Sequence, residues 1–464
     1  MVKILNQYFP GRVFLLLVTE NVLIILGIWA TVSLQTGRGV FGLLPDSALL
    51  SKVLLITVVC QTCLYFNDLY DLKSIRSSAE ILIGALKSFG AASIILALIY
   101  TVVPRARFGR GVVETTVLSV ALVILLWRVL IEWVHRLYGT GDRILVIGTG
   151  PHAAALTRQI GSRPDLHFRV LGLVSVNGVG PEIATAGAPY LGQLAKLKEI
   201  AGRAKPDRVV IALEERRQYL PMETLLRLRL EGVRVEYANT LYEKLTGRIP
   251  IDSIQPSGLV FSDVLHKSAR SFFYRRVVGV TFALWGLAVL SPLLVLIAIA
   301  IKLDSPGPVL YRQARVGLDG HVFEILKFRS MRTDAESGTG PVWARKDDPR
   351  VTRVGRVLRK LRLDEVPQLI NIVRGDMNFV GPRPERPYFV EKLTPLIPYY
   401  DIRHVIRPGV TGWAQVSCSY GSTVDEAKDK LEYDVFYIKN QSISLDLVIL
   451  FQTLKIALFS RGAR

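Results

Sequence analysis

Cysteine is scarce in this chain of 464 residues, which contains only Cys60, Cys63 and Cys418. Three cysteines support neither a disulfide framework nor a zinc site. Cys60 and Cys63 have CxxC spacing, but they lie in an apolar segment with no second pair and no nearby histidine. We therefore expect two buried thiols here rather than a redox or metal centre.

Acidic residues are also few, and their shortage sets the charge of the chain. There are 39 Asp and Glu against 58 Lys and Arg, which gives a formal net charge of +19. This excess favours anionic partners such as nucleic acid, phospholipid headgroups or phosphorylated small molecules. The hydrophobic content of 50% and the mean hydropathy of +0.33 indicate a membrane protein. We therefore expect membrane lipid and phosphate as partners, and no nucleic acid.

Four apolar runs dominate the first third of the chain. No small-residue cleavage site follows residues 1–12, so we expect a membrane anchor there rather than a cleaved signal peptide. Each run is close to the roughly 20 residues that a helix needs to cross a bilayer. The runs cover 13–34, 53–69, 81–103 and 112–134. They predict a four-helix transmembrane bundle over residues 1–138.

Two polar residues, Glu20 and Asn21, interrupt the first apolar run. We expect them to lie at the membrane interface or to form hydrogen bonds within the bundle, since no other buried acid suggests an ion path. Basic residues occur in loops on both sides of the predicted bundle, so the loop charges leave its orientation open.

The pattern then changes to short β-branched runs that alternate with helical ones, which predicts a parallel α/β domain over residues 139–264. The predicted strands are RILVIGTG, FRVLGLVSV, DRVVIAL and VRVEYA. The first strand runs into a turn with Gly148, Gly150 and Ala153, which fits a dinucleotide-binding loop. The acidic residue expected after the second strand is missing, because Ser175 and Asn177 lie there. We expect a degenerate Rossmann-like domain with a structural or regulatory role, and nucleotide binding remains the alternative.

A fifth apolar run, Val277 to Ile301, contains Ser291 and Pro292. Proline removes a backbone donor and bends a helix. Four crossings return the chain to its starting side, so a fifth would place the basic C-terminal third opposite the α/β domain. We therefore predict a re-entrant helix over about 275–302 that is broken at Ser291 and Pro292, with a kinked transmembrane helix as the alternative. The predicted fold class is membrane α plus α/β, with an α/β catalytic domain over 265–464.

Cations and acids gather in this last domain. The run FEILKFRSM predicts a strand with Lys327 and Arg329 on one face. The run DDPRVTRVGRVLRKLRLDE predicts a basic amphipathic helix, either on anionic lipid or in solvent. In the rigid turn VGPRP, Arg383 can bind a phosphate with both arms of its guanidinium.

Asp364 and Glu365 lie side by side in this basic region. A carboxylate among phosphate-binding cations can attack phosphorus, because the cations neutralise a pyrophosphate. A second carboxylate can hold Mg²⁺ or handle a proton. The alternative is a pair of acids that only form salt bridges with arginines at a helix start. The strand cations and the turn arginine are close in sequence, which favours the catalytic interpretation.

The C-terminal third resembles the bacterial sugar transferase family, the monotopic polyprenyl-phosphate phosphoglycosyl transferases. The matching motifs are YRQARVG at 311–317, KFRSM at 327–331, LDEVPQLINIVRGDM at 363–377, VGPRP at 380–384 and RPGVTGWAQV at 407–416. The four apolar runs and the degenerate dinucleotide fold are similar to the large subclass that starts exopolysaccharide and O-antigen repeat units.

The resemblance implies a reaction on a UDP-sugar. In it, Asp364 attacks the β-phosphate, UMP leaves, and undecaprenyl phosphate takes the sugar phosphate from the enzyme. Glu365 would assist with Mg²⁺ or with the acceptor, so both acids are candidate metal ligands. Phosphate contacts are expected from Lys327, Arg329 and Arg383. Nucleotide or sugar contacts are expected from the 407–414 loop with Gln415, including Arg407 and Thr411.

The resemblance also implies a place in the cell. Arg275 and Arg276 would lie at the lipid headgroups where the re-entrant helix begins. Because UDP-sugars are cytosolic, the resemblance implies a multi-pass protein of the bacterial inner (cytoplasmic) membrane whose catalytic domain faces the cytoplasm. A homo-oligomer is left open.

One departure and two alternatives accompany this interpretation. Many family members continue AQV with Asn-Gly-Arg-Asn, whereas this chain has Ser-Cys-Ser-Tyr-Gly at 417–421, as in a subgroup of exopolysaccharide systems.

A tethered nucleotide-sugar dehydratase or epimerase would need a Tyr-xxx-Lys pair in the α/β domain, but that spacing occurs at Tyr388 and Lys392, outside it. A membrane scaffold or sensor would leave the cations around the acid pair unexplained.

Overall fold

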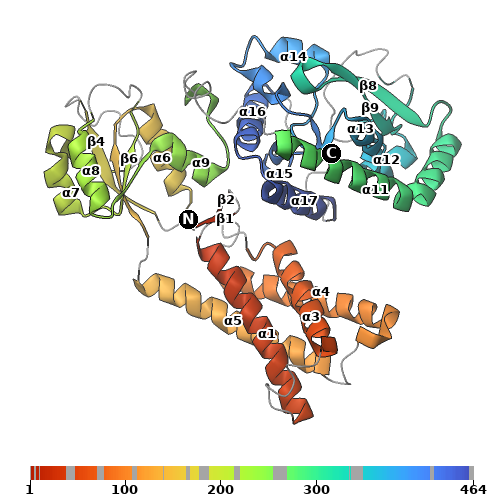
Figure 1. The fold of residues 1–464 in the computed structure, drawn as a ribbon, viewed down its shortest axis with the longest axis horizontal. Helices are drawn as coiled ribbons and strands as arrows, with labels where there is room; N and C mark the ends of the chain where they lie inside the picture. The colour runs from red at the N-terminus through yellow and green to blue at the C-terminus, as the bar shows by residue number, and fades with distance from the viewer. Residues whose placement is uncertain are drawn as a thin grey trace. The chain divides into compact units, whose positions relative to one another are not determined.

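The computed structural model in Figure 1 forms two compact units. Apart from the first few residues, one unit ends at Ala238 and the other begins at Asn239. The predicted domain boundaries after residues 138 and 264 adjoin or fall inside stretches outside the described residues, so they stay predictions. The structure describes residues 2–4, 7–9, 11–37, 47–70, 78–106, 112–138, 141–163, 168–176, 188–213, 220–253, 269–333, 335, 348–418 and 423–458.

Long apolar helices occupy the first part of the first unit, where the sequence predicts them. They are α1 (Gly11–Thr36), α3 (Ser47–Phe66), α4 (Ser78–Val102) and α5 (Val112–Tyr138). The shorter elements are β1 (Val2–Ile4), β2 (Gln7–Phe9) and η1 (Pro104–Ala106). Each long helix contains a segment that is long and apolar enough to cross a membrane. The four helices share a core that includes Ile24, Ile56, Leu96 and Ile124.

Glu20 and Arg128 form an ion pair inside this core. Glu20 is 0% exposed and Arg128 is 5% exposed, and Arg128 Nε lies 2.7 Å from Glu20 Oε1. Arg128 Nη1 also donates to the Leu69 carbonyl at 2.8 Å, and the Tyr70 hydroxyl donates to Glu20. Glu20 therefore hydrogen-bonds within the helices, as expected, and its cation comes from α5. Asn21 donates to the Leu17 carbonyl of its own helix at 2.7 Å.

The rest of the first unit is a parallel α/β structure, as predicted. Its strands lie in the order β5-β4-β3-β6-β7, which matches the first five strands of the six-stranded Rossmann order. The strands are β3 (Arg143–Ile147), β4 (Arg169–Ser175), β5 (Tyr190–Gln193), β6 (Arg208–Ile211) and β7 (Arg234–Tyr237). The helices are α6 (Pro151–Gly161), η4 (Leu194–Lys196), α7 (Leu197–Ala204) and α8 (Met222–Leu230). The sequence did not predict β5, because its residues YLGQ include a glycine and no β-branched side chain.

The second unit starts within α9 (Ala238–Thr246), continues through η5 (Ile251–Ser253) and contains two small sheets. The antiparallel hairpin is β8 (Leu310–Val316) and β9 (Val322–Phe328), joined by η7 (Leu318–Gly320). The parallel pair is β10 (Asn378–Val380) and β11 (Gly409–Thr411). The helical elements are α11 (Ala269–Asp304), α12 (Arg353–Lys360), η8 (Leu363–Glu365), α13 (Gln368–Arg374), α14 (Pro387–Leu393), η9 (Tyr400–His404), α15 (Trp413–Ser417), α16 (Val424–Lys439) and α17 (Ile443–Leu458).

Two predictions in this unit need correction in detail. The strand predicted to reach Met331 ends at Phe328, and Met331 forms an isolated bridge with Val351 instead. The predicted apolar face of the basic helix α12 is split, because Leu358 is 3% exposed whereas Val357 is 55% exposed. Only part of that face therefore packs inward.

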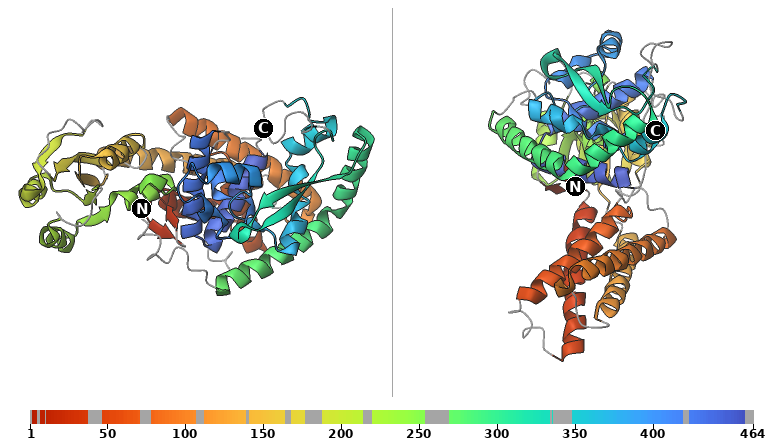
Figure 2. Two further views of the ribbon diagram at one scale, coloured as in Figure 1. Left: turned by 90° about the horizontal axis from the view of Figure 1, so that it is seen from above. Right: turned by 90° about the vertical axis from the view of Figure 1, so that its right-hand side faces the viewer.

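The long helix α11 bends at a serine-proline pair. Pro292 lacks the N–H that would donate to the Ala288 carbonyl, four residues earlier. The Ser291 hydroxyl donates to this same carbonyl at 2.7 Å, so the carbonyl keeps a partner. Figure 2 shows the two halves of α11 meeting at an angle. The predicted break is thus a bend inside one continuous helix, and a re-entrant path through a membrane stays a prediction.

We expect Arg128→Met to lower the free energy of unfolding by about 3 to 5 kcal/mol, because it leaves the Glu20 carboxylate buried without its cation. Denaturant unfolding in detergent measures this loss. The matched control adds Glu20→Leu, which removes the stranded charge and restores most of the stability. Equal unfolding midpoints for wild type and Arg128→Met would contradict the role assigned to the ion pair.

Candidate active site

The acid pair lies on a tight turn between two helices of the second unit. Arg362 follows α12 in a left-handed backbone conformation with φ of 55°. Asp364 and Glu365 then lie in the single 3-10 turn η8, and α13 begins at Gln368. The turn places both carboxyl groups at the N-terminal side of α13, which agrees with the helix start named in the salt-bridge alternative.

Two cations hold Glu365. Its Oε1 accepts hydrogen bonds from Lys327 Nζ at 2.8 Å and from Arg383 Nη2 at 2.9 Å, and its side chain is 14% exposed. Burial alone would raise the pKa of Glu365, but the charges and hydrogen bonds of Lys327 and Arg383 outweigh it and hold the pKa well below its usual range. Glu365 is therefore a fixed anion that keeps two cations together.

Asp364 has a different electrostatic environment from its neighbour. Burial raises its pKa, the charge of Lys327 lowers it, and the adjacent Glu365 raises it again, so that the net direction is upward. A carboxylate with a raised pKa has a higher affinity for a proton or another electrophile. The two adjacent acids are thus divided into one that anchors cations and one suited to react.

Lys327 reaches Glu365 because the buried side chain of Asn371 fixes β9 against α13. Asn371 Oδ1 accepts from the Leu326 amide at 3.0 Å, and its Nδ2 donates to the Glu324 carbonyl at 2.7 Å. The side-chain amide thus bonds the free edge of β9 as a neighbouring strand would. Asn371 is not among the predicted site residues, although an amide between Ile370 and Ile372 in an apolar run was a possible signal.

Arg383 is placed by close packing between β10 and β11. The Gly381 amide donates to the Thr411 carbonyl at 2.9 Å, and the Gly409 amide donates to the Pro382 carbonyl at 2.9 Å. A Cβ on Gly409 would lie 2.1 Å from the Gly381 nitrogen, so only glycine allows the two backbones to approach. The turn that carries Arg383 is therefore rigid, as the VGPRP motif predicts.

Arg329 does not join this group. It is 5% exposed, and its guanidinium donates to the Pro306 carbonyl at 2.9 Å and to the Ser305 carbonyl at 2.7 Å. It follows the last residue of β9 and closes the C-terminal end of α11. The expected alternation with Lys327 requires the strand to continue past Phe328, and it does not.

The other predicted contact residues lie around β11. The Thr411 hydroxyl is 2.6 Å from the Thr453 hydroxyl, and Gln415 Nε2 donates to the Val410 carbonyl at 3.3 Å. Gln415 Oε1 is buried with no hydrogen-bond partner among the described atoms. The guanidinium of Arg407 lies 4.4 Å from the centre of the Phe272 ring. Their roles toward nucleotide or sugar stay predictions.

Arg275 and Arg276 both bind protein groups at the start of α11. Arg275 Nη1 lies 2.8 Å from Asp446 Oδ2 and donates to the Tyr437 hydroxyl at 3.0 Å. Arg276 Nη2 donates to the Val373 carbonyl at 2.7 Å, at the end of α13. These contacts fasten the start of α11 to α13 and α17 within the second unit. A role at lipid headgroups stays a prediction.

The donor chemistry of the acid pair fits Mg²⁺ in a restricted way. Among the residues that the structure describes, no group of three His, Cys, Asp or Glu side chains comes together as a metal site. Mg²⁺ commonly takes one or two protein carboxylates and completes its shell with water and substrate phosphate. Both cations bond Glu365 through Oε1. A metal ion would therefore use Asp364 and Glu365 Oε2.

The glycine turn of the α/β domain lies at the carboxyl end of β3, as predicted. Gly148 has φ of +128°, and a Cβ there would lie 2.4 Å from the Ala212 carbonyl oxygen, so packing against the end of β6 alone requires glycine. Gly150 precedes α6, and Ala153 is 0% exposed inside it. Ser175 is 1% exposed, and Asn177 lies outside the described residues. Nucleotide binding at this turn stays a prediction.

Two family models match separate parts of the chain. A family model described as bacterial sugar transferase matches residues 270–460, and a model described as CoA-binding domain matches residues 65–234. The first match contains the acid pair and the cations around it.

Several curated relatives share long stretches of sequence with the chain. It is 30% identical over 488 residues to an undecaprenyl-phosphate glucose phosphotransferase of Komagataeibacter xylinus, which covers 93% of this chain and 88% of the relative. It is 32% identical over 337 residues to a UDP-glucose:undecaprenyl-phosphate glucose-1-phosphate transferase of Klebsiella pneumoniae, with 70% of each chain covered. A UDP-N-acetylgalactosamine-undecaprenyl-phosphate N-acetylgalactosaminephosphotransferase of Aeromonas hydrophila is 42% identical over 240 residues, which span 52% of this chain and 56% of the relative.

Proposed function

The chain belongs to the bacterial sugar transferase family, and from that premise we propose that it transfers a sugar 1-phosphate from a UDP-sugar to undecaprenyl phosphate and releases UMP. The observation that carries the proposal is the difference between the surroundings of Asp364 and Glu365. Lys327 and Arg383 meet at Glu365, while the adjacent Asp364 has a raised pKa. The names of the relatives support both the acceptor and the phosphotransfer.

In the first step, Asp364 acts as the nucleophile. A carboxylate oxygen forms a bond to the β-phosphorus of the UDP-sugar, and the bond from that phosphorus to the bridging oxygen breaks. UMP leaves with the bridging oxygen, and the sugar phosphate stays on Asp364 as an acyl phosphate. Lys327 and Arg383 stabilise the charge that develops on the phosphate oxygens, because Glu365 holds both in place before the substrate arrives.

In the second step, the phosphate oxygen of undecaprenyl phosphate attacks the same phosphorus. The bond to Asp364 breaks, the carboxylate is restored, and the product is an undecaprenyl diphosphate sugar. This product is the first membrane-bound intermediate of an exopolysaccharide repeat unit. Mg²⁺ held by Asp364 and Glu365 Oε2 would supply further neutralisation of the diphosphate.

We place the chain in the bacterial inner membrane with the catalytic unit facing the cytoplasm. Five helices among the described residues are long and apolar enough to span, and the fifth is α11 with its bend at Pro292. A re-entrant α11 keeps both of its ends on the cytoplasmic side, where UDP-sugars are made.

A cysteine at Leu303, which is 83% exposed near the end of α11, tests this orientation. In a cysteine-free background, we expect Leu303→Cys to resist a membrane-impermeant thiol reagent in intact cells and to react after lysis. Val103→Cys, between α4 and α5, is the periplasmic control and reacts in intact cells. Labelling of Leu303→Cys in intact cells would rule out the re-entrant path.

The reaction itself is tested with detergent-purified protein, Mg²⁺, undecaprenyl phosphate and a panel of UDP-sugars. We expect UMP with the preferred sugar, and Asp364→Asn to lower its release by at least about a thousandfold, because the nucleophile is lost. Asp401→Asn, at a side chain that is 67% exposed in the same unit, is the matched control and keeps full activity. Release of UDP, or activity retained in Asp364→Asn, would contradict the mechanism.

Lys327→Met tests the electrostatics of the acid pair through the pH dependence of kcat/KM. Asp364 must be ionised to attack, and Lys327 lowers its pKa. Removing this charge raises the pKa further, so we expect the acid limb of the profile to move to higher pH. The control Lys392→Met, at an exposed residue of α14, leaves the limb where it is. Superimposable profiles for the two variants would argue against the assigned role of Lys327.

A further inference from the structure

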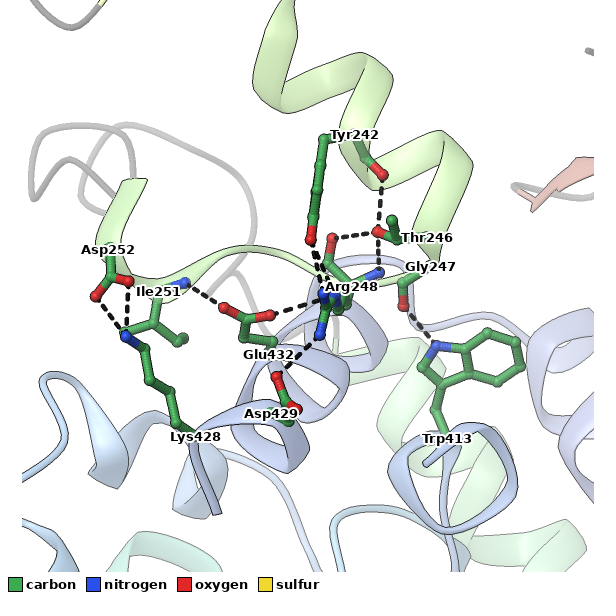
Figure 3. Close-up of polar contacts among 10 residues, drawn as sticks. All are labelled: Tyr242, Thr246, Gly247, Arg248, Ile251, Asp252, Trp413, Lys428, Asp429 and Glu432. Carbon is green, nitrogen blue, oxygen red and sulfur yellow. Dashed lines mark hydrogen bonds and ion pairs between the residues drawn. The ribbon is translucent and has the colours of Figure 1, made fainter. Parts of the chain in front are cut away.

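The segment between α9 and η5 lies against α16, as Figure 3 shows. Arg248 Nη1 donates to Asp429 Oδ1 at 2.9 Å, and its Nε lies 3.5 Å from Glu432 Oε2. Its Nε and Nη2 also donate to the Tyr242 hydroxyl, at 3.2 Å and 2.8 Å. One guanidinium therefore joins α9, the segment and α16.

Backbone bonds and a second ion pair extend this contact. The Ile249 amide donates to the Glu432 carbonyl, and the Ile251 amide donates to Glu432 Oε1, both at 3.1 Å. Lys428 Nζ donates to Asp252 Oδ2 at 2.6 Å. Ile251 is 1% exposed and belongs to a core cluster with Phe389, Leu393, Ile397, Tyr400, Leu431 and Val435. A segment with a buried anchor is an integral part of the catalytic unit rather than a free linker.

The same segment holds Trp413. The indole Nε1 donates to the Gly247 carbonyl at 2.7 Å, and the ring stacks on Phe436 of α16 with centroids 5.9 Å apart. Gly247 has φ of +68°, and a Cβ there would lie 3.1 Å from the Trp413 ring. Trp413 begins α15 directly after Gly412, so the segment fixes the C-terminal end of the loop over residues 407–414, which contains β11 and is called the β11 loop below.

A series of hydrogen bonds connects α16 to the acid pair. Asp434 is 1% exposed and accepts from Arg403 Nη2 at 3.0 Å. The same nitrogen donates to the Arg383 carbonyl at 3.0 Å. Arg383 in turn donates to Glu365. The β11 loop reaches the same arginine through the backbone bonds to Gly381 and Pro382.

We propose that Arg248 and Trp413 are positioning residues for the transfer reaction, because they hold the segment 247–252 against α16 and the β11 loop and thereby set Arg383 on Glu365. The inference rests on the proposed function. Neither family match covers the segment, since one ends at residue 234 and the other begins at residue 270.

The test is Arg248→Glu in the full chain, which places a third acid beside Asp429 and Glu432. We expect kcat for UMP release to fall roughly tenfold to a hundredfold, because small displacements of positioned groups have effects of this size. KM for the UDP-sugar stays close to wild type, since Arg248 is not expected to touch substrate. Adding Asp429→Arg exchanges the charges and restores turnover.

The matched control is Arg227→Glu on α8, where the partner Glu223 is 80% exposed and the pair lies on a helix surface. An exposed pair of this kind contributes little, so turnover stays at the wild-type level. Turnover is compared where circular dichroism shows each variant fully folded. A structural role alone would then leave kcat unchanged.

A second measurement does not depend on the reaction. We expect hydrogen exchange at the Gly381 and Gly409 amides to be faster in Arg248→Glu than in wild type. The bonds of these amides join β11 to the turn after β10, and that turn carries Arg383. Arg227→Glu leaves both rates unchanged. If wild type releases no UMP with any UDP-sugar, the proposed function fails, and these exchange rates alone decide the present inference.

Two results would overturn the inference. One is unchanged kcat in folded Arg248→Glu together with unchanged exchange at both glycines. The other concerns Trp413→Phe, which decides the matter if Arg248→Glu does not fold. This variant removes the indole donor to Gly247 but keeps a ring on Phe436, and we expect kcat to fall several-fold. Full turnover in Trp413→Phe would show that the hold on the β11 loop is not needed.

Discussion

The contact of two cations with one carboxylate oxygen is the constraint on which the catalytic unit depends. Lys327 comes from β9, Arg383 from the turn after β10, and Glu365 from η8, so three separate elements must meet within hydrogen-bonding distance. Removing one charged partner of a largely buried carboxylate lowers the free energy of unfolding by about 3 to 5 kcal/mol. Each element is therefore fixed by groups that bond backbone rather than solvent. The reactive Asp364 needs no such clamp, because its position follows from being the neighbour of Glu365 in the chain.

The side chains that position the two cations all form hydrogen bonds to backbone groups. Asn371 has no exposed surface, and both ends of its amide bond the backbone of β9, which sets the strand that carries Lys327. In the turn that carries Arg383, Arg315 donates to the Pro384 carbonyl at 2.9 Å, and Arg403 donates to the Arg383 carbonyl. Burial lowers the pKa of Arg315 to about 10, which still leaves it charged at neutral pH. Polar side chains with several fixed bonds are well suited to this task because they restrict direction as well as distance.

The sequence predicted what depends on local pattern and missed what depends on distant partners. The apolar helices, the parallel sheet and the acid pair with Lys327 and Arg383 follow from run length, alternation and motif, and the structure has them in those places. Arg329 shares the motif of Lys327, yet the strand ends between them, three residues before its predicted end, and the end of a strand cannot be derived from alternation. The partner of Glu20 is another such case, since Arg128 lies in a different helix and only packing brings the two together.

The buried pair of Arg403 and Asp434 fixes the position of the backbone next to the acid pair. Burial would lower the pKa of Arg403, but Tyr400 and Asp434 outweigh it and raise that pKa. Burial raises the pKa of Asp434 to about 6 even though Arg403 opposes it. An acid whose pKa is higher in the folded chain than in the unfolded chain lowers stability as pH rises through that interval, whereas the raised pKa of Arg403 favours folding, so the two shifts oppose each other. Asp434 of α16 gives Arg403 a fixed hydrogen-bond partner. Arg403 in turn donates to the backbone carbonyl of Arg383, the residue that bonds Glu365.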